Sequence, residues 1–211
     1  MMICISITST DFSECERAVR SSQMAELRFD IMQLQPAQLQ ALLQGSTPIV
    51  ATCREGVYAQ GERMSLLKYA IEHGAALVDV EVEADEAYRK ALVEFAKKHG
   101  CKVIISYHNF EGTPSVAELK NIISTCRSMG ADVVKLITTA HTAQDSARVL
   151  SLYETEKDLV AFAMGEAGKI TRLACLYLGA PFTYASMGAG KEAAKGQMTA
   201  ENMREVVERM K

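Results

Sequence analysis

The run Lys102-Val103-Ile104-Ile105-Ser106 is the stretch from which the fold of this chain is predicted. Its apolar residues follow one another without the alternation of a strand that has one wet face. A strand of this kind is expected to be covered on both faces, as in a parallel sheet that carries helices. Helical segments are therefore expected before and after this run.

The same succession of strand and helix recurs along the chain. Residues 62–73 and 85–99 have the apolar spacing of amphipathic helices, and Pro114 opens another helix with Thr113 as its cap. Glycines stand where four helices are expected to end, at Gly74, Gly100, Gly130 and Gly179. Eight β-rich runs lie between the helices, at residues 2–7, 24–29, 48–53, 76–82, 102–107, 132–137, 159–163 and 182–186.

Eight strand–helix units predict a (β/α)8 TIM barrel of the α/β class, although an open doubly wound sheet shows the same alternation. The chain has 211 residues, fewer than the usual length of about 250, so a compact barrel is expected. Because no linker or low-complexity tract divides the sequence, residues 1–211 are predicted to form a single domain.

The composition excludes several classes of protein. The chain has 23 Lys and Arg against 26 Asp and Glu, a net charge of −3, which argues against a broad basic face for nucleic acid. The apolar runs are too short to cross a membrane, and the N-terminal residues lack the basic region of a signal peptide. The six cysteines are scattered without a CxxC motif, which favours reduced thiols and a cytoplasmic location.

Charged residues gather where the early strands of the barrel end, the face on which such barrels carry their active sites. Glu26, Arg28 and Asp30 follow at period two and are expected to face one side, and Arg54 ends the third run. A structural ion pair at the barrel mouth is the alternative to ligand binding. The fourth run adds three carboxylates at period two, Asp79, Glu81 and Glu83.

These carboxylates allow more than one interpretation. Asp79 and Glu81 are expected to face the lumen near the arginines, where they could form structural pairs, orient a base or hold substrate hydroxyls. Magnesium is disfavoured because the arginines compete with it, and no clustered Cys/His motif suggests another metal. We therefore expect neither a metal nor a cofactor.

Two residues on the middle strands are suited to catalysis. His108 follows an apolar strand, where an imidazole can move protons near neutral pH, whereas His73 and His99 lie at helix ends and His141 is expected on the surface. Lys135 lies inside an apolar strand, and a buried lysine either pairs with a carboxylate such as Asp79 or Glu81 or acts as a nucleophile toward carbonyls.

The last two loops contain further candidates for binding. Residues 164–172 combine Met164, a glycine-rich turn and Arg172, whose guanidinium suits a carboxylate or phosphate. Residues 188–197 are polar and rich in glycine and lack the Walker spacing, so they predict either a phosphate-binding loop or a loop that closes over a substrate.

Seven motifs occur in order, and together they resemble the type I 3-dehydroquinate dehydratase family over nearly the whole chain. They are Glu-x-Arg-x-Asp at Glu26, Thr-x-Arg at Thr52, Asp-x-Glu at Asp79, Ser-Tyr-His at Ser106, Lys135, the run from Met164 to Arg172, and Gly196-Gln197 before the last helix. The resemblance implies a (β/α)8 barrel that acts on 3-dehydroquinate in the shikimate pathway without metal or cofactor, commonly as a homodimer.

The resemblance also implies a role for each residue. Lys135 would form an imine with the substrate ketone, His108 would remove a C2 proton and then protonate the departing C1 hydroxyl, and Arg172 would bind the substrate carboxylate. The ring hydroxyls would be bound by Glu26, Arg28 and Arg54. Met164 would pack beside the ring, and Gln197 would contact the substrate from the closing loop.

Three departures from the family pattern leave points open. The segment after Arg54 is shortened, so the carboxylate partner of the histidine could be Glu55, Glu62 or Glu81. The closing loop has Ala193 and Lys195 where the family usually has serine and proline, and Asn109 stands where an aspartate often follows the histidine. The first two departures, after Arg54 and in the closing loop, concern loop stiffness and affinity and leave the chemistry intact.

Two other functions remain alternatives from the sequence. Another Schiff-base barrel, such as a transaldolase-like aldolase, would also use a lysine near strand six, but it would bind a sugar phosphate. A non-catalytic ligand-binding barrel would need neither Lys135 nor His108. The sequence also does not decide between a biosynthetic and a quinate-degrading role, nor does it locate the dimer surface.

Overall fold

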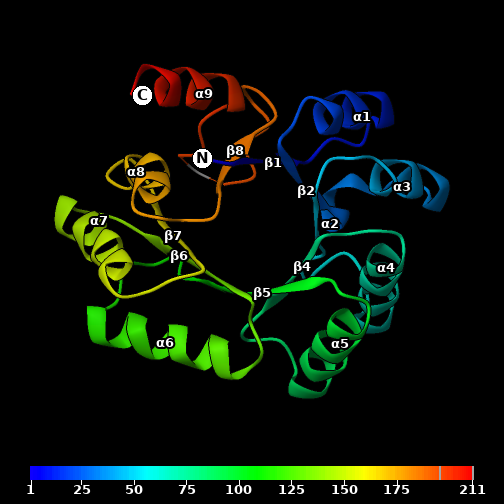
Figure 1. Cartoon of the computed structure of the whole chain (residues 1–211), viewed down its shortest axis with the longest axis horizontal. Coiled ribbons are helices and arrows are strands. Elements are labelled where there is room, and N and C mark those ends of the chain that lie inside the picture. Colours follow the sequence, from blue (N-terminus) through cyan, green and yellow to red (C-terminus); the bar gives the residue numbers. More distant parts are fainter. Residues whose placement is uncertain (195, 211) are drawn as a thin grey trace.

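The computed structural model describes residues 1–194 and 196–210, in which eight parallel strands alternate with helices around a nearly closed barrel (Figure 1). The hydrogen-bonded order is β7-β6-β5-β4-β3-β2-β1-β8, so β7 and β8 are the two ends of the sheet. The predicted barrel is confirmed. The strands are β1 (Ile3–Ile7), β2 (Met24–Arg28), β3 (Ile49–Thr52), β4 (Leu77–Glu81), β5 (Lys102–His108), β6 (Val133–Thr139), β7 (Leu159–Met164) and β8 (Thr183–Ser186).

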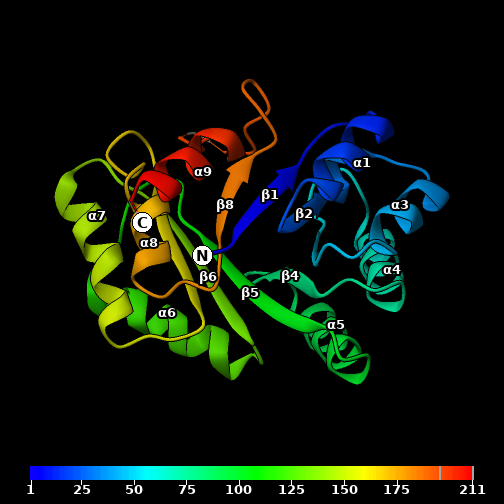
Figure 2. The same ribbon diagram turned by 45° about the horizontal axis from the view of Figure 1, so that its top comes forward.

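The helices form a ring outside the strands, which Figures 1 and 2 show from two directions. The glycines predicted to end four of them all have positive φ, between 73° and 107°, a backbone region that L side chains rarely adopt. The helices are α1 (Phe12–Arg20), α2 (Phe29–Met32), α3 (Pro36–Leu43), α4 (Gln60–Glu72), α5 (Glu86–Lys98), α6 (Val116–Ser128), α7 (Ala143–Leu150), the 3-10 helix η1 (Ser151–Glu154), α8 (Thr171–Tyr177) and α9 (Ala200–Arg209).

The predicted start of α6 is wrong by two residues. Ser115 caps this helix, because its hydroxyl accepts the Glu118 amide while the Glu118 carboxylate accepts the Ser115 amide. Thr113 instead donates its hydroxyl to the carbonyl of Thr139, at 2.9 Å. The reciprocal bonds of a capping box outweigh the preference of Pro114 for the first turn of a helix.

The interior of the barrel changes from apolar to polar along most of its strands. Side chains two residues apart face the same way, so β2 presents Met24 and then Glu26 to the lumen, and β5 presents Ile104 and then Ser106. The first members of such pairs belong to an apolar cluster inside the barrel, and the second members lie nearer the C-terminal ends of the strands. The polar side chains near the C-terminal ends of the strands therefore lie on a layer of apolar side chains inside the barrel.

A second and larger apolar cluster fills the space between the strands and the helices. All six cysteines are buried as free thiols. Within residues 1–194 and 196–210, no helix has the length and apolar character needed to span a bilayer.

Candidate active site

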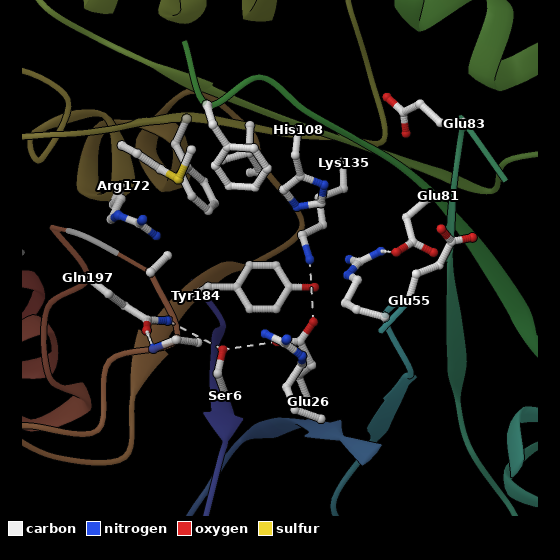
Figure 3. A pocket seen from close by; sticks show the side chains of 18 residues that line it. Ser6, Glu26, Glu55, Glu81, Glu83, His108, Lys135, Arg172, Tyr184 and Gln197 are labelled. Carbon is white, nitrogen blue, oxygen red and sulfur yellow. Dashed lines mark hydrogen bonds and ion pairs between the residues drawn. The ribbon is translucent and has the colours of Figure 1, made fainter. Parts of the chain in front are cut away.

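A cavity of about 570 Å³ opens at the C-terminal ends of the strands (Figure 3). It is bounded by side chains from β1, β2, β4, β5, β6, β7 and β8, from the loops that follow β3, β4, β5 and β8, and from α8. The structure places around it all eight of the residues predicted from the sequence: Lys135, His108, Glu26, Arg28, Arg54, Arg172, Met164 and Gln197.

Lys135 is buried on β6 and its ammonium contacts two carboxylates. Nζ lies 3.0 Å from Oδ2 of Asp79 and 3.3 Å from Oε1 of Glu26, and it lies 4.4 Å from the ring centre of Tyr184. Of the two partners weighed from the sequence, Asp79 makes the pair and Glu81 does not reach it. The lysine is therefore held by charge at a fixed point of the cavity, where a carbonyl carbon can approach it.

Asp79 is the centre of the buried charge network. Its Oδ1 accepts the Ser106 hydroxyl at 2.6 Å, and its Oδ2 accepts both Lys135 and Arg54 Nη2, the latter at 2.9 Å. Burial alone would raise the pKa of Asp79, but Arg54, Lys135 and Ser106 hold that pKa well below its usual range. Asp79 therefore stays ionised and stabilises two cations.

Glu26 is also engaged within the chain. Its Oε2 accepts the Ser6 hydroxyl at 3.0 Å, and its Oε1 accepts the Thr52 hydroxyl at 3.0 Å in addition to Lys135. Because a carboxylate has about four lone-pair sites, one acceptor position is left for a ligand.

His108 lies on the strand next to Lys135. Ser106 pairs in register with Lys135, and His108 is two residues further along the same face of β5, so both side chains face the cavity. Burial, followed by the positive charges of Arg54 and Lys135, lowers the pKa of His108 well below its ordinary value. The imidazole is therefore neutral at pH 7 and able to accept a proton.

The carboxylates proposed as partners of His108 occupy different places. Glu62 accepts the amide of Ala59 at the start of α4 and does not line the cavity. Glu55 and Glu81 do line it, and both bind the buried Arg63, at 3.0 and 2.9 Å. Asp79, which was not among the candidates, is the carboxylate that opposes the lowering of the His108 pKa.

Arg172 is the most unusual group in the cavity. It is 1% exposed, and among the described residues its Nε and Nη2 have no hydrogen-bond partner. Its guanidinium lies 4.3 Å from the ring centre of Phe162, and burial lowers its pKa to about 10. A buried, unpaired guanidinium beside a cavity has the charge and the free donors that an anion requires.

Arg28 and Arg54 form the other cationic side of the cavity. Arg28 donates from Nε and Nη2 to the two oxygens of Asp30, at 3.1 and 2.6 Å. The expectation that Asp30 continues the face of strand two is wrong, because the chain turns into α2 after Arg28 and Asp30 lies in that helix. Arg28 and Asp30 therefore form an ion pair at the barrel mouth, and Arg28 also lines the cavity, so the pair does not exclude ligand binding by Arg28.

The loop between β8 and α9 covers one side of the cavity through Ala193, Ala194 and Gln197. Gln197 is buried and donates from Nε2 to the Ser6 hydroxyl at 3.3 Å. The departure at Lys195 lies outside the described residues.

Sequence reasoning missed several residues of this region, and four of them are instructive. Ser6 could have been found, since it follows Cys4 at period two on the first strand. Tyr184 and Phe162 gave no signal, because aromatic residues are common in strands. Arg63 gave none either, because an arginine in a helix is usually exposed, whereas this one is 3% exposed and holds two carboxylates. The residue after the histidine, Asn109, accepts the amides of the following turn.

A nearly closed (β/α)8 barrel whose cavity combines a buried lysine, a neutral histidine and an unpaired arginine defines a barrel enzyme that acts on a small anionic carbonyl compound. Within the described ranges, no group of three or more His, Cys, Asp or Glu side chains is gathered as a metal site.

Comparison with known proteins identifies the family. The family model for type I 3-dehydroquinase matches residues 3–211. The 3-dehydroquinate dehydratases of Dehalococcoides mccartyi (strain BAV1) and Pyrococcus abyssi are 35% and 34% identical, over 97% and 98% of this chain and 93% and 97% of their own. The crystal structure of 3-dehydroquinate dehydratase from Aquifex aeolicus VF5 superposes with a TM-score of 0.86 at 26% identity, covering 100% of this chain and 99% of that one. The chain belongs to the type I 3-dehydroquinase family.

Proposed function

We propose that this chain removes water from 3-dehydroquinate to give 3-dehydroshikimate, the dehydration step of the shikimate pathway, through an imine on Lys135. Family membership supports the reaction, and it favours this reaction over a transaldolase-like aldolase or a non-catalytic barrel. The observation that carries the proposal is the placement of Lys135, His108 and Arg172 around one cavity.

The chemistry follows from the properties of two side chains. The ammonium of Lys135 first releases a proton to solvent, and the free amine attacks the ketone carbon. The adduct then takes up a proton and loses water, which gives the protonated imine. The protonated imine withdraws electrons, so the adjacent C2–H becomes acidic enough for the neutral imidazole of His108 to remove the proton. The electron pair then expels the C1 hydroxyl, to which His108 returns the proton, and hydrolysis of the imine frees the product. The imine supplies the electron sink, so this route needs no metal or cofactor.

The remaining groups of the cavity bind and orient the substrate. Arg172 takes the carboxylate, because its Nε and Nη2 lack a partner among the residues that the structure describes. Arg28, Arg54 and Glu26 hold ring hydroxyls with the donor and acceptor positions that their internal pairs leave free. Met164 packs beside the ring and Gln197 contacts the substrate from the loop.

The proposal extends to the organisation of the protein. We propose that residues 1–211 act as one domain, in the cytoplasm, and as a homodimer. The buried free thiols are compatible with a reducing compartment. The exposed apolar side chains of Ile170, Tyr177 and Leu178, at and beside α8, are a candidate surface for a second copy. Sedimentation analysis tests the dimer, and a monomeric mass would contradict it.

A direct activity assay tests the proposed reaction. Purified protein is expected to convert 3-dehydroquinate into a product with the ultraviolet absorbance of a conjugated carboxylic acid. Lys135→Met, which keeps the length of the side chain but not the amine, is expected to lose this activity. The absence of turnover in the wild-type protein at any substrate concentration would refute the proposal.

A further inference from the structure

The loop between β8 and α9 is attached to the cavity through Gln197. The side chain of Gln197 accepts the amide of Ala193 at 2.8 Å and donates to Ser6 at 3.3 Å. Ser6 in turn donates to Glu26, which contacts Lys135. The position of this loop is therefore linked, bond by bond, to the group that surrounds the lysine.

The same loop is attached at a second place, to the segment between β1 and α1 and to the first turn of α1. Figures 1 and 2 show the two segments side by side. The ammonium of Lys191 forms an ion pair with the carboxylate of Glu14. Thr8 adds two bonds, from its hydroxyl to the carbonyl of Lys191 and from its amide to Sδ of Met187, each 3.3 Å long.

Glu14 is also held in place by bonds to residues near it in the sequence. It lies in the first turn of α1, where its amide donates to the capping residue Asp11 at 2.8 Å. The Ser9 hydroxyl donates to the other carboxylate oxygen of Glu14 at 2.5 Å. The bond from Lys191, and then the bond from Ser9, lower the pKa of Glu14, so that it is ionised at neutral pH.

We propose that Glu14 and Lys191 are positioning residues whose ion pair holds the β8–α9 loop over the cavity and so places Gln197 on the bound substrate. The pair opens when substrate enters and product leaves. Neither residue lines the cavity, so each acts only through the loop. This inference rests on the proposed function for the identity of the substrate.

The topology of this pair sets it apart from an ordinary surface ion pair. Lys90 and Glu86 join adjacent turns of one helix, whereas Lys191 and Glu14 are 177 residues apart and join a helix to a loop. Both side chains of the Glu14–Lys191 ion pair are partly exposed. The contribution of this pair to the position of the loop is therefore expected to be modest and to fall with salt. Loss of the pair is therefore expected to raise KM about two- to fivefold and to leave kcat within about twofold.

Charge reversal gives the sharpest test. Lys191→Gln is expected to raise KM for 3-dehydroquinate about two- to fivefold, and Lys191→Glu to raise it further, because two carboxylates then face each other. The double variant Glu14→Lys with Lys191→Glu restores the pair in reverse and is expected to bring KM back to within about twofold of the wild-type value. Lys90→Glu makes the same change in an ion pair away from the cavity and serves as the matched control.

A readout without turnover separates this inference from the proposed function. In the ligand-free protein, Lys191→Gln is expected to speed hydrogen exchange at the amides of Ala193 and Gln197, while Lys90→Glu leaves it unchanged. If the wild-type protein does not dehydrate 3-dehydroquinate, the proposed function fails, and the exchange rates still decide the role of the ion pair. Unchanged exchange in Lys191→Gln, or a double variant with the KM of Lys191→Glu, would overturn the inference.

Discussion

Replacing Arg172 with methionine is expected to stabilise the ligand-free protein while it weakens ligand binding. Burial lowers the pKa of Arg172 to about 10, and no carboxylate of the described residues offsets this effect. At about 1.36 kcal/mol for each pKa unit, the charged guanidinium costs the folded chain about 3 kcal/mol. The sign is destabilising, because the folded chain binds this proton less tightly than the unfolded chain does. The full cost is present below about pH 10 and is lost only in more alkaline solution.

Methionine fills much of the same space without the charge. It also loses the contact of the guanidinium with the Phe162 ring, at 4.3 Å, so the expected net gain in folding free energy is about 1–3 kcal/mol. For a chain of this size the melting temperature rises by about 2–4 °C for each kcal/mol. Thermal or urea unfolding of the ligand-free protein measures this directly.

The same variant is expected to lose affinity for the substrate. A charge-assisted bond to a carboxylate contributes about 1.5–3 kcal/mol, so kcat/KM is expected to fall at least about tenfold, and added product should no longer raise the melting temperature. The reasoning would be refuted if Arg172→Met destabilised the ligand-free protein by several kcal/mol, since the guanidinium would then serve the fold itself.

Three further predictions follow from the same cavity. Burial and nearby cations keep the pKa of His108 below 6.5, so kcat/KM is expected to stay on its plateau as the pH falls through 6.5 and to drop only in more acidic buffer. Half-maximal kcat/KM at pH 6.5 would contradict this pH dependence. His108→Ala should lower kcat by about 10²–10⁴-fold while imine formation persists. Asp79→Asn leaves two buried cations with one partner fewer and is expected to destabilise the protein by about 3–5 kcal/mol in urea unfolding, whereas a loss below about 1 kcal/mol would show that the network does not depend on this carboxylate. Tyr184→Phe and Tyr88→Phe each remove a buried hydroxyl that has no partner among the described residues, so neither is expected to lower the melting temperature, and a fall of several degrees in either would reveal a bond that the structure lacks.

The fold was predictable because strand and helix leave different patterns in the sequence. The apolar runs without alternation, such as 102–106, indicated strands covered on both faces, and the glycines after the helices marked their ends. The start of α6 could not be predicted as well, because Thr113 and Ser115 are both capping residues. Only the position of Glu118, three residues after Ser115, decides between them.

The candidate site was predictable where polar residues break an apolar strand. Lys135 and Arg28 stand out in this way, and the order of the motifs made the resemblance specific. Pairing across the barrel was harder to predict. Asp79 and Glu81 are equivalent by period, and Glu81 is the one in register with Ser106 and Lys135 on the next two strands. Lys135 nevertheless contacts Asp79, two residues earlier on β4, while Glu81 binds Arg54 and Arg63.

Contacts from outside the strands could not be predicted at all. Arg63 reaches the carboxylates from α4, and Glu14 reaches Lys191 from α1 across 177 residues of sequence. Both depend on how the helices and loops pack around the barrel, and a local pattern of residues does not encode that arrangement.

Trapping the imine tests the central claim most directly. The protein is incubated with 3-dehydroquinate, reduced with borohydride, digested and analysed by peptide mass spectrometry. A stable adduct on the peptide that contains Lys135 is expected, and it should also form with His108→Ala. An active protein that gives no adduct on Lys135, or an adduct on another lysine, would contradict the account.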